Sequence, residues 1–230
     1  MNIFIADIKE RTATLTTEES WHCAKVLRYK VNDGVDLIDG KGAFYKAVLT
    51  TVHEKQCVAN ITEGPIFQVK RPYYLHLAIA PTKQIDRIEW MIEKAVEIGI
   101  DEITFIKCKN SERVNVKTER IQKIVESAVK QSKQAIIPKV NDLIEFKKCI
   151  QETASLKLIA HCANSEKVNI KDLKQQSGSI LVLIGPEGDF SKEEVELAST
   201  AGFKQLGLGE TRLRTETAGL YVVQAFSILT

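Results

Sequence analysis

Glycines and charged residues that could form a reaction site are concentrated in two short loops near the C-terminus. Residues 185–188 have the sequence GPEG and follow an apolar run over residues 180–184, and residues 213–218 have the sequence LRTETA. A short apolar run that stops at glycine predicts a buried strand ending in a tight loop. Because ligands of open α/β sheets bind beyond the carboxyl ends of the strands, we expect a ligand site here. The alternative is a pair of ordinary turns with a solvated charge cluster.

The segments around these loops predict the scaffold that would hold them. Ser191 and Glu194 have the spacing of a capping box, which predicts a helix that begins there and ends at Gly202. Apolar periodicity and turn residues predict the remaining elements. These are strands over residues 74–80, 102–106, 156–161 and 205–208, and helices that close at Gly99 or cover residues 118–135 and 218–229. Their alternation predicts an α/β domain with a mostly parallel sheet.

The N-terminal third of the chain has a different pattern, made of short alternating segments. Asp39 and Gly40 predict a hairpin, since this pair accepts the positive φ angles of tight turns. One helix is expected over residues 17–29, and two prolines interrupt the pattern near its end. We therefore expect a small antiparallel β-barrel over residues 1–72 and an α/β domain over residues 73–230.

The composition is that of a globular protein of a reducing compartment. Hydrophobic residues make up 44% of the 230 residues and charged residues 27%, and no apolar run approaches the ~20 residues of a membrane-spanning helix. The N-terminus lacks the pattern of a signal peptide, and the five scattered cysteines include no CxxC pair. His161 and Cys162 would point to opposite faces of a strand, so we expect them to be buried rather than to bind a metal. We expect a cytoplasmic protein.

The net charge of +2 is unevenly distributed along the chain. Residues 107–148 contain eleven Lys or Arg against five Asp or Glu, whereas residues 181–230 contain four against seven. A basic face of this kind indicates a polyanionic partner. An ordinary solvated helix surface would have the same composition, so this alternative stays open.

Taken in order, the two loops resemble the paired signature GPEGG…LG…LRTETA of the SPOUT methyltransferases. The closer resemblance is to the ribosomal RNA small subunit methyltransferase E family, which methylates N3 of a uridine in 16S rRNA, and it extends over nearly the whole chain. Within this signature, three residues depart from the family pattern. Asp189 stands where the family usually has glycine, and Glu210 and Thr211 replace a common proline and arginine.

This resemblance implies a SPOUT α/β domain with a trefoil knot, preceded by a PUA-like RNA-binding barrel. It also implies that S-adenosyl-L-methionine is the cofactor, and that small residues in the strand-end loops let the backbone approach this ligand. The residues expected to bind the cofactor are Ile184, Gly185, Pro186, Glu187, Gly188, Leu208, Gly209, Leu213, Thr215, Thr217 and Ala218.

The implied reaction requires a base, because uridine N3 is a poor nucleophile until its proton leaves. Glu187 and Glu216 are the carboxylates expected to accept this proton, and Arg214 is expected to stabilise negative charge on the flanking carbonyl oxygens. A purely structural role for Glu216, as part of the first turn of the last helix, is the alternative. No metal is expected, since the sulfonium of the cofactor is already an excellent leaving group.

The resemblance also implies RNA contacts outside the two loops. Arg28 and Lys30, in the basic group that ends the expected N-terminal helix, are RNA-contact candidates, and so is Arg113 in a polar loop after residue 109. The alternatives are a basic helix end that is favourable to the helix dipole and a pairing of Arg113 with Glu112.

Relatives of this kind are homodimers, and the last helix has more apolar surface than one helix face needs. Its apolar residues are Val222, Val223, Ala225, Phe226 and Leu229. We therefore expect a homodimer that acts on 16S rRNA of the small ribosomal subunit. Two alternatives remain: a SPOUT methyltransferase for another RNA or for a ribose 2′-hydroxyl, and a non-catalytic RNA-binding assembly factor.

Overall fold

The computed structural model describes residues 2–173 and 177–229, which form two compact units. The first unit consists of residues 1–70 with residues 129–137, and the second of residues 71–128 with residues 138–230. Within the described ranges, no helix is both long and apolar enough to cross a membrane.

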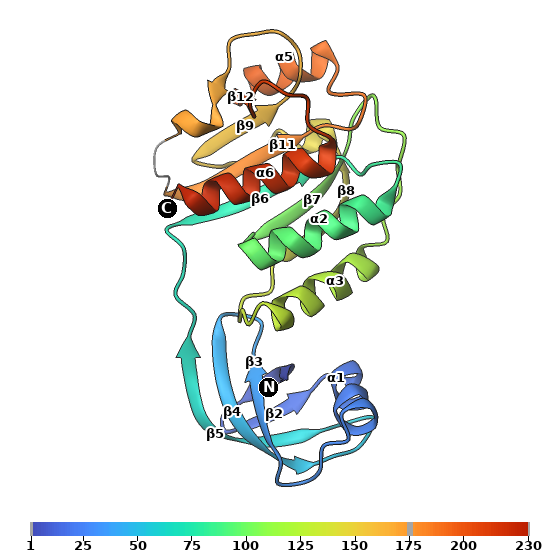
Figure 1. The fold of residues 1–230 in the computed structure, drawn as a ribbon, viewed down its shortest axis with the longest axis vertical. Coiled ribbons are helices and arrows are strands. Elements are labelled where there is room, and N and C mark those ends of the chain that lie inside the picture. Colours follow the sequence, from blue (N-terminus) through green and yellow to red (C-terminus); the bar gives the residue numbers. More distant parts are fainter. Residues whose placement is uncertain (1, 174–176, 230) are drawn as a thin grey trace. The chain divides into compact units, whose positions relative to one another are not determined.

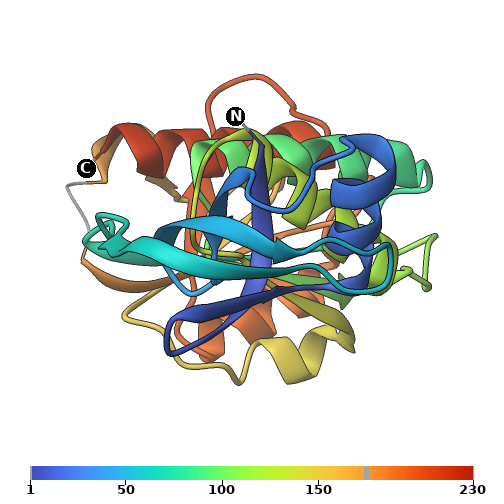
Figure 2. The same ribbon diagram turned by 90° about the horizontal axis from the view of Figure 1, so that it is seen from below.

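A closed five-stranded barrel forms the first unit (Figure 2). Around the barrel the order is β1-β2-β5-β4-β3. The expectation of an antiparallel barrel was wrong at one seam, because β1 and β3 pair in parallel. The reason is that β2 runs back antiparallel to β1, so β3, which follows β2, begins at the same end of the barrel as β1 and runs in the same direction. The strands are β1 (Ile3–Lys9), β2 (Thr12–Leu15), β3 (Gly34–Ile38), β4 (Ala43–Thr51) and β5 (Val58–Phe67).

Local sequence signals explain the turns of this barrel. The expected hairpin joins β3 and β4, and the Asp39 carboxylate accepts hydrogen bonds from the backbone amides of Lys41, Gly42 and Ala43 at 2.7 to 3.0 Å. The expected helix is present as α1 (Thr17–Trp21) continued by a π-helix, η1 (His22–Val26). It ends before Arg28, which has a φ of 57°.

The second unit is an α/β domain with a seven-stranded sheet in the order β10-β12-β9-β11-β6-β7-β8 (Figure 1). Each strand pair of this sheet within the described residues is parallel, as expected. The strands are β6 (Tyr73–Ile79), β7 (Glu102–Lys107), β8 (Lys139–Glu145), β9 (Leu156–Ala160), β10 (Val168–Asn169), β11 (Gly178–Ile184) and β12 (Lys204–Gly207). The helices that accompany them are α2 (Ile85–Ile98), α3 (Thr118–Gln131), α4 (Phe146–Cys149), η2 (Ile170–Asp172), α5 (Lys192–Thr200) and α6 (Thr215–Ile228).

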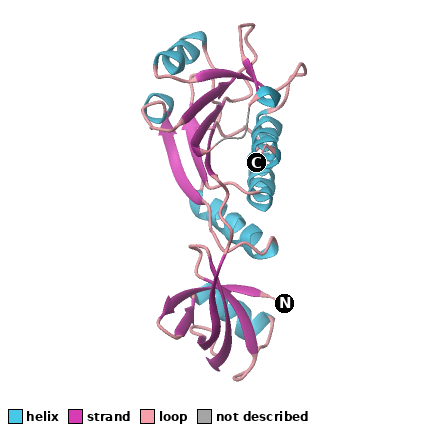
Figure 3. Ribbon diagram, turned by 90° about the vertical axis from the view of Figure 1, so that its left-hand side faces the viewer, coloured by secondary structure: helices cyan, strands magenta, loops and turns pink. Residues whose placement is uncertain are grey.

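Helices cover both faces of this sheet (Figure 3). On one face α6 packs beside α2 and onto β6, so closely that a Cβ at Gly219 would lie 3.1 Å from Ile79 of β6 and 3.4 Å from Met91 of α2. On the other face an apolar cluster joins the sheet to α4 and α5, with Phe146 and Phe190 in ring contact. The parallel strands are therefore buried on both sides, which is why they appear in the sequence as continuous apolar runs.

Several boundaries and two strands differ from the sequence expectation, and the two-residue strand β10 is too short to leave a pattern in the sequence. The capping box at Ser191 is confirmed, but α6 begins three residues earlier than expected, and α3 ends before Lys133, whose φ is 54°. Strand β8 was missed because its polar residues lie on a half-buried edge strand. The strand order does not test the expected knot or the functional boundary after residue 72, and both stay predictions.

Candidate active site

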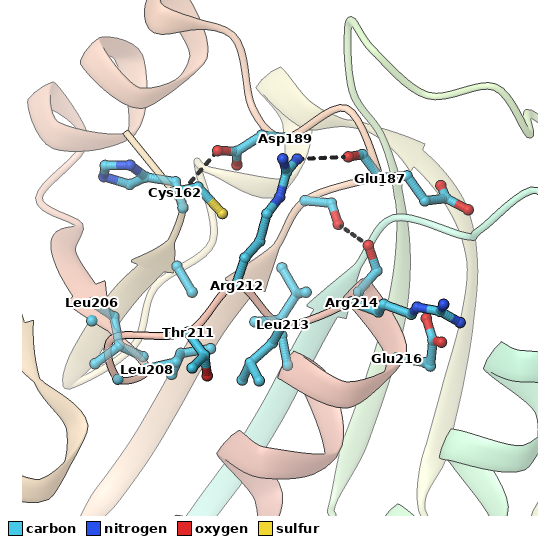
Figure 4. A pocket seen from close by; sticks show the side chains of 18 of the residues that line it. Cys162, Glu187, Asp189, Leu206, Leu208, Thr211, Arg212, Leu213, Arg214 and Glu216 are labelled. Atoms are coloured by element: carbon cyan, nitrogen blue, oxygen red, sulfur yellow. Dashed lines mark hydrogen bonds between the residues drawn. The ribbon is translucent and has the colours of Figure 1, made fainter. Parts of the chain in front are cut away.

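A cavity of about 620 Å³ lies at the carboxyl ends of β9, β11 and β12 (Figure 4). These strands are neighbours in the sheet although the chain visits them in the order β9, β11, β12. Their last residues, Ala160, Ile184 and Gly207, line the cavity, and the LRTETA loop closes another side. The size is typical of ligand pockets, which measure about 300–1,000 Å³.

The GPEG loop after β11 is held by the loops of two other strands. The Lys83 backbone amide, after β6, donates to the Glu187 carboxylate at 2.9 Å. The Asn110 side chain, after β7, donates to the Gly188 and Asp189 carbonyl oxygens at 3.1 and 3.0 Å. Because these bonds join residues about 80 to 100 positions apart, they fix the loop only in the folded domain.

The start of α6 is joined directly to the same loop. The buried Thr215 hydroxyl donates to the Gly185 carbonyl oxygen at 3.0 Å. Gly185 itself lies against Phe190, since an added Cβ would meet the Phe190 ring at 3.0 Å and its backbone nitrogen at 3.2 Å. The first glycine of GPEG is therefore required by close packing rather than by its φ angle.

Three charged side chains line the cavity near the first turn of α6. Arg214 is exposed and occupies the N-cap position, and Glu216 is only 8% exposed. The Glu216 carboxylate lies 3.6 Å from the Arg87 guanidinium of α2. This ion pair fixes the orientation of Glu216, and Arg87 was not expected from the sequence.

Most of the residues expected to bind the cofactor meet at this cavity. Those that line it are Ile184, Gly185, Pro186, Glu187, Leu208, Gly209, Leu213, Thr215 and Ala218. Gly188 and Thr217 do not line it, and both are exposed. The catalytic candidates Glu187, Arg214 and Glu216 line the same cavity.

The loop after β9 adds lining residues that the sequence analysis missed. His161 is buried as expected, but Cys162 is exposed, because β9 ends at Ala160 and both residues belong to the following loop. His161 donates through Nε2 to the Gln205 side-chain oxygen, and its buried Nδ1 has no partner among the described residues. Lys167 and Asp189 complete this side of the cavity. In the sequence, only the alternation of side chains along a strand bore on His161, and this alternation stops at Ala160, where β9 ends.

The three RNA-contact candidates have different environments. Arg28 and Lys30 are exposed in the connection between η1 and β3. Arg113 is partly buried, and its guanidinium donates to the Thr82 and Lys83 carbonyl oxygens at 2.7 to 3.3 Å. Arg113 therefore holds the loop after β6, whereas Glu112 pairs with Lys83.

Much of the basic region over residues 107–148 is neutralised by contacts within each unit. At least six of its eleven cationic side chains donate to protein oxygens, mostly carboxylates. They are Lys107, Lys109, Arg113, Arg120, Lys130 and Lys139. The charge count alone therefore overstates the basic surface that a polyanion would meet.

Comparison with protein families identifies both parts of the chain. A model described as an RNA methyltransferase domain matches residues 69–227, and one described as an RNA methyltransferase PUA domain matches residues 15–62. The parallel-sheet domain with its strand-end cavity, together with the barrel, thus defines an RNA methyltransferase with a PUA domain.

Individual relatives narrow this class. The ribosomal RNA small subunit methyltransferase E of Mesomycoplasma hyopneumoniae is 34% identical over 96% of both chains. A crystal structure of a probable rRNA-methyltransferase from Porphyromonas gingivalis has 41% identity and a TM-score of 0.90, covering 100% of this chain and 98% of its own. The Neisseria gonorrhoeae ribosomal RNA small subunit methyltransferase E, bound to S-adenosyl methionine, has 29% identity and a TM-score of 0.85 at the same coverage. The chain belongs to the ribosomal RNA small subunit methyltransferase E family.

Proposed function

We propose that this protein transfers a methyl group from S-adenosyl-L-methionine to N3 of a uridine in 16S rRNA of the small ribosomal subunit. The observation that carries the proposal is the single cavity that the GPEG and LRTETA loops share at the carboxyl ends of three parallel strands. A relative with the same fold over its whole length was solved with S-adenosyl methionine bound.

The residues around the cavity fit this cofactor. Ile184, Leu206, Leu208, Leu213 and Ala218 supply apolar surface for an adenine ring. The free Nδ1 of His161 is an unprotonated acceptor, since Nε2 carries the proton that bonds Gln205, and so it can accept a hydrogen bond from a ligand N–H or O–H. Carboxylates and cationic side chains both line the cavity, which suits a ligand with charges of both signs.

We assign the binding of this cofactor to the strand-end loops. The glycine-containing backbone after β11 and β12 would lie against the nucleoside, where small residues allow close approach. Gly209 has a φ of 115°, which other residues resist, and no atom lies within 4 Å of the position of an added Cβ, so the backbone conformation rather than packing favours glycine here.

The chain's own residues then act on the uridine. Bound cofactor supplies an electrophilic methyl group on its sulfonium. Arg214 is exposed beside the cavity without a partner among the described residues, and it would stabilise the negative charge that develops on the uracil carbonyl oxygens. Glu216, oriented by Arg87, would take the N3 proton. Glu187 is the second candidate base, although one of its carboxylate oxygens already accepts the Lys83 amide.

We infer that the barrel, residues 1–72, binds RNA and presents it to the catalytic domain, residues 73–230. Arg28 supports this role because its left-handed backbone lies two residues after the end of a π-helix, and both features occur often at functional sites. Lys30 lies two residues further along on the same surface segment. Arg113 contributes indirectly, by holding the loop after β6.

We propose that the protein is a homodimer located in the cytoplasm, where its ribosomal substrate is found. Val222, Val223 and Phe226, which suggested a dimer from the sequence, are buried in the chain's own core. The support comes instead from Tyr221 and Ile228 on the outer side of α6, which are 43% and 71% exposed. Light scattering that reports a monomer at micromolar concentration would contradict this proposal.

The test of the proposed function is transfer of labelled methyl from S-adenosyl-L-methionine to small ribosomal subunits that lack the modification. We expect 3-methyluridine, identified by mass spectrometry of the nucleosides. Comparing Glu216→Gln with Glu187→Gln in this assay identifies the base, with the larger loss expected for Glu216→Gln. A different methylated nucleoside would contradict the assigned acceptor, and no transfer at all would contradict the proposed reaction.

A further inference from the structure

Asp189 joins the two loops that follow the adjacent strands β9 and β11. Its Oδ2 accepts a hydrogen bond from the Cys162 backbone amide at 2.8 Å, across 27 residues of sequence (Figure 4). Its Oδ1 accepts one from the Phe190 backbone amide, also at 2.8 Å. Both Asp189 and Cys162 line the cavity. The carboxylate therefore forms part of the cavity wall and fixes the position of the loop that contains His161.

The backbone explains why glycine would be the ordinary residue here. Asp189 has a φ of 65°, in the left-handed region that favours glycine and that aspartate tolerates better than most residues. Aspartate at this position thus carries a conformational cost that glycine would not. The two amide hydrogen bonds of its carboxylate offset that cost, because hydrogen bonds to a charged acceptor are the stronger kind.

In the described part of the chain, the Asp189 carboxylate is hydrogen-bonded by backbone amides rather than paired with a cation. Within residues 2–173 and 177–229, Asp189 forms no ion pair with a lysine or arginine. The Arg212 guanidinium, which also lines the cavity, donates instead to the Glu187 carbonyl oxygen at 3.4 Å. The Asp189 carboxylate therefore faces a partly buried part of the cavity without a paired cation among the described residues, and a charged group there acts more strongly on a ligand charge than it would in bulk water.

We propose that Asp189 is a positioning and specificity-determining residue, which holds the loop after β9 against the GPEG loop and favours a cationic nucleoside over its neutral product. This inference rests on the proposed function. Methyl transfer breaks the bond between sulfur and the methyl carbon, and the bonding electrons stay on sulfur, so the sulfonium cation becomes a neutral thioether. S-adenosyl-L-homocysteine therefore has one positive charge fewer than S-adenosyl-L-methionine. A carboxylate in the wall attracts the substrate more than the product and so favours product release.

The test compares the affinities of the purified full-length chain for the two nucleosides by isothermal titration calorimetry. Asp189→Asn keeps the size of the side chain but removes its charge, and Asp189→Gly removes the side chain. Glu196→Gln, a charge change at an exposed position of α5 outside the cavity, is the matched control. We expect Asp189→Asn to weaken S-adenosyl-L-methionine about tenfold and S-adenosyl-L-homocysteine by less than about threefold. The control should change neither affinity.

Hydrogen exchange at the Cys162 amide, measured without any nucleoside, tests the contact between the loops. We expect exchange at least about tenfold faster in Asp189→Gly than in the wild type, because the amide loses its acceptor. Equal weakening of both nucleosides in Asp189→Asn would overturn the specificity role, and unchanged exchange at Cys162 would overturn the positioning role. A wild-type chain that binds neither nucleoside would refute the proposed function together with the specificity role. Normal wild-type binding with an unchanged preference in the variant would refute the specificity role of Asp189 and leave the proposed function standing.

Discussion

Replacement of Thr215 by valine tests how the last helix is joined to the cofactor loop. Thr215 is 5% exposed, and its hydroxyl donates to the carbonyl oxygen of the buried Gly185 at 3.0 Å. Valine has nearly the same shape but no donor, so the Gly185 carbonyl oxygen stays buried without this hydrogen bond. Leaving a buried acceptor unsatisfied costs about 1–3 kcal/mol.

This cost is large enough to measure. A loss of about 2 kcal/mol raises the unfolding equilibrium constant roughly 30-fold and, for a domain of this size, lowers the melting temperature by about 4–8 °C. The same change removes the hydrogen bond that holds the Gly185 carbonyl group of the GPEG loop. We therefore also expect weaker binding of S-adenosyl-L-methionine to Thr215→Val.

Thr215→Ser is the matched control, because it keeps the hydroxyl and loses only a methyl group, at a cost of about 1 kcal/mol. Thermal unfolding followed by circular dichroism and calorimetric titration of the cofactor would compare the three proteins. If valine and serine variants melted together and bound the cofactor equally well, the hydrogen bond to Gly185 would not hold the loop, and our explanation of this site would be wrong.

Three other predictions concern stability, pH and catalysis. Gly99→Ala should lower the free energy of unfolding by about 1–3 kcal/mol in urea titrations, since Gly99 has a φ of 120° and a Cβ there would lie 1.7 Å from Arg71 Nη1; an unchanged midpoint would contradict this. Burial lowers the pKa of His76 and of His161 in the folded chain, so as the pH falls both histidines become protonated in the unfolded chain before they do in the folded one. Stability should therefore fall as the pH drops below their unfolded pKa of 6.5. Melting temperatures between pH 7.5 and 5.5 would check the sign, and they should vary less when both histidines are replaced by glutamine. Arg214→Ala should reduce methyl transfer ~100-fold or more through loss of an oriented charged donor, with little change in cofactor affinity; wild-type turnover would remove Arg214 from the mechanism.

Local signals in the sequence determined much of the fold. The Ser191 capping box, the hairpin at Asp39 and the apolar run of β11 each depend on residues within a few positions of one another. A short segment can form such interactions without contacts from the rest of the chain. These elements therefore appear in the structure close to their expected bounds. Strands β8 and β10 were the exceptions, because both lie at an edge of the sheet and an edge strand needs no continuous apolar pattern.

The candidate site was predictable where it follows directly from strand ends. Gly185, Leu208 and Leu213 were expected to meet, and they line one cavity. Arg87 and Asp189 were not expected as parts of its wall. Nothing near Arg87 in the sequence indicates that Glu216, more than a hundred residues later, would be its partner.

What the sequence by itself determined was the identity of the loops, the strands before them and the family to which they belong. The tertiary structure decided which side chains serve the site. The Lys83 amide meets Glu187 across 104 residues, and Arg113 binds backbone carbonyl oxygens of the loop after β6 rather than the neighbouring Glu112. The physical reason is the strand order, since a parallel sheet brings the ends of distant strands to one edge, and only there do their loops exchange hydrogen bonds.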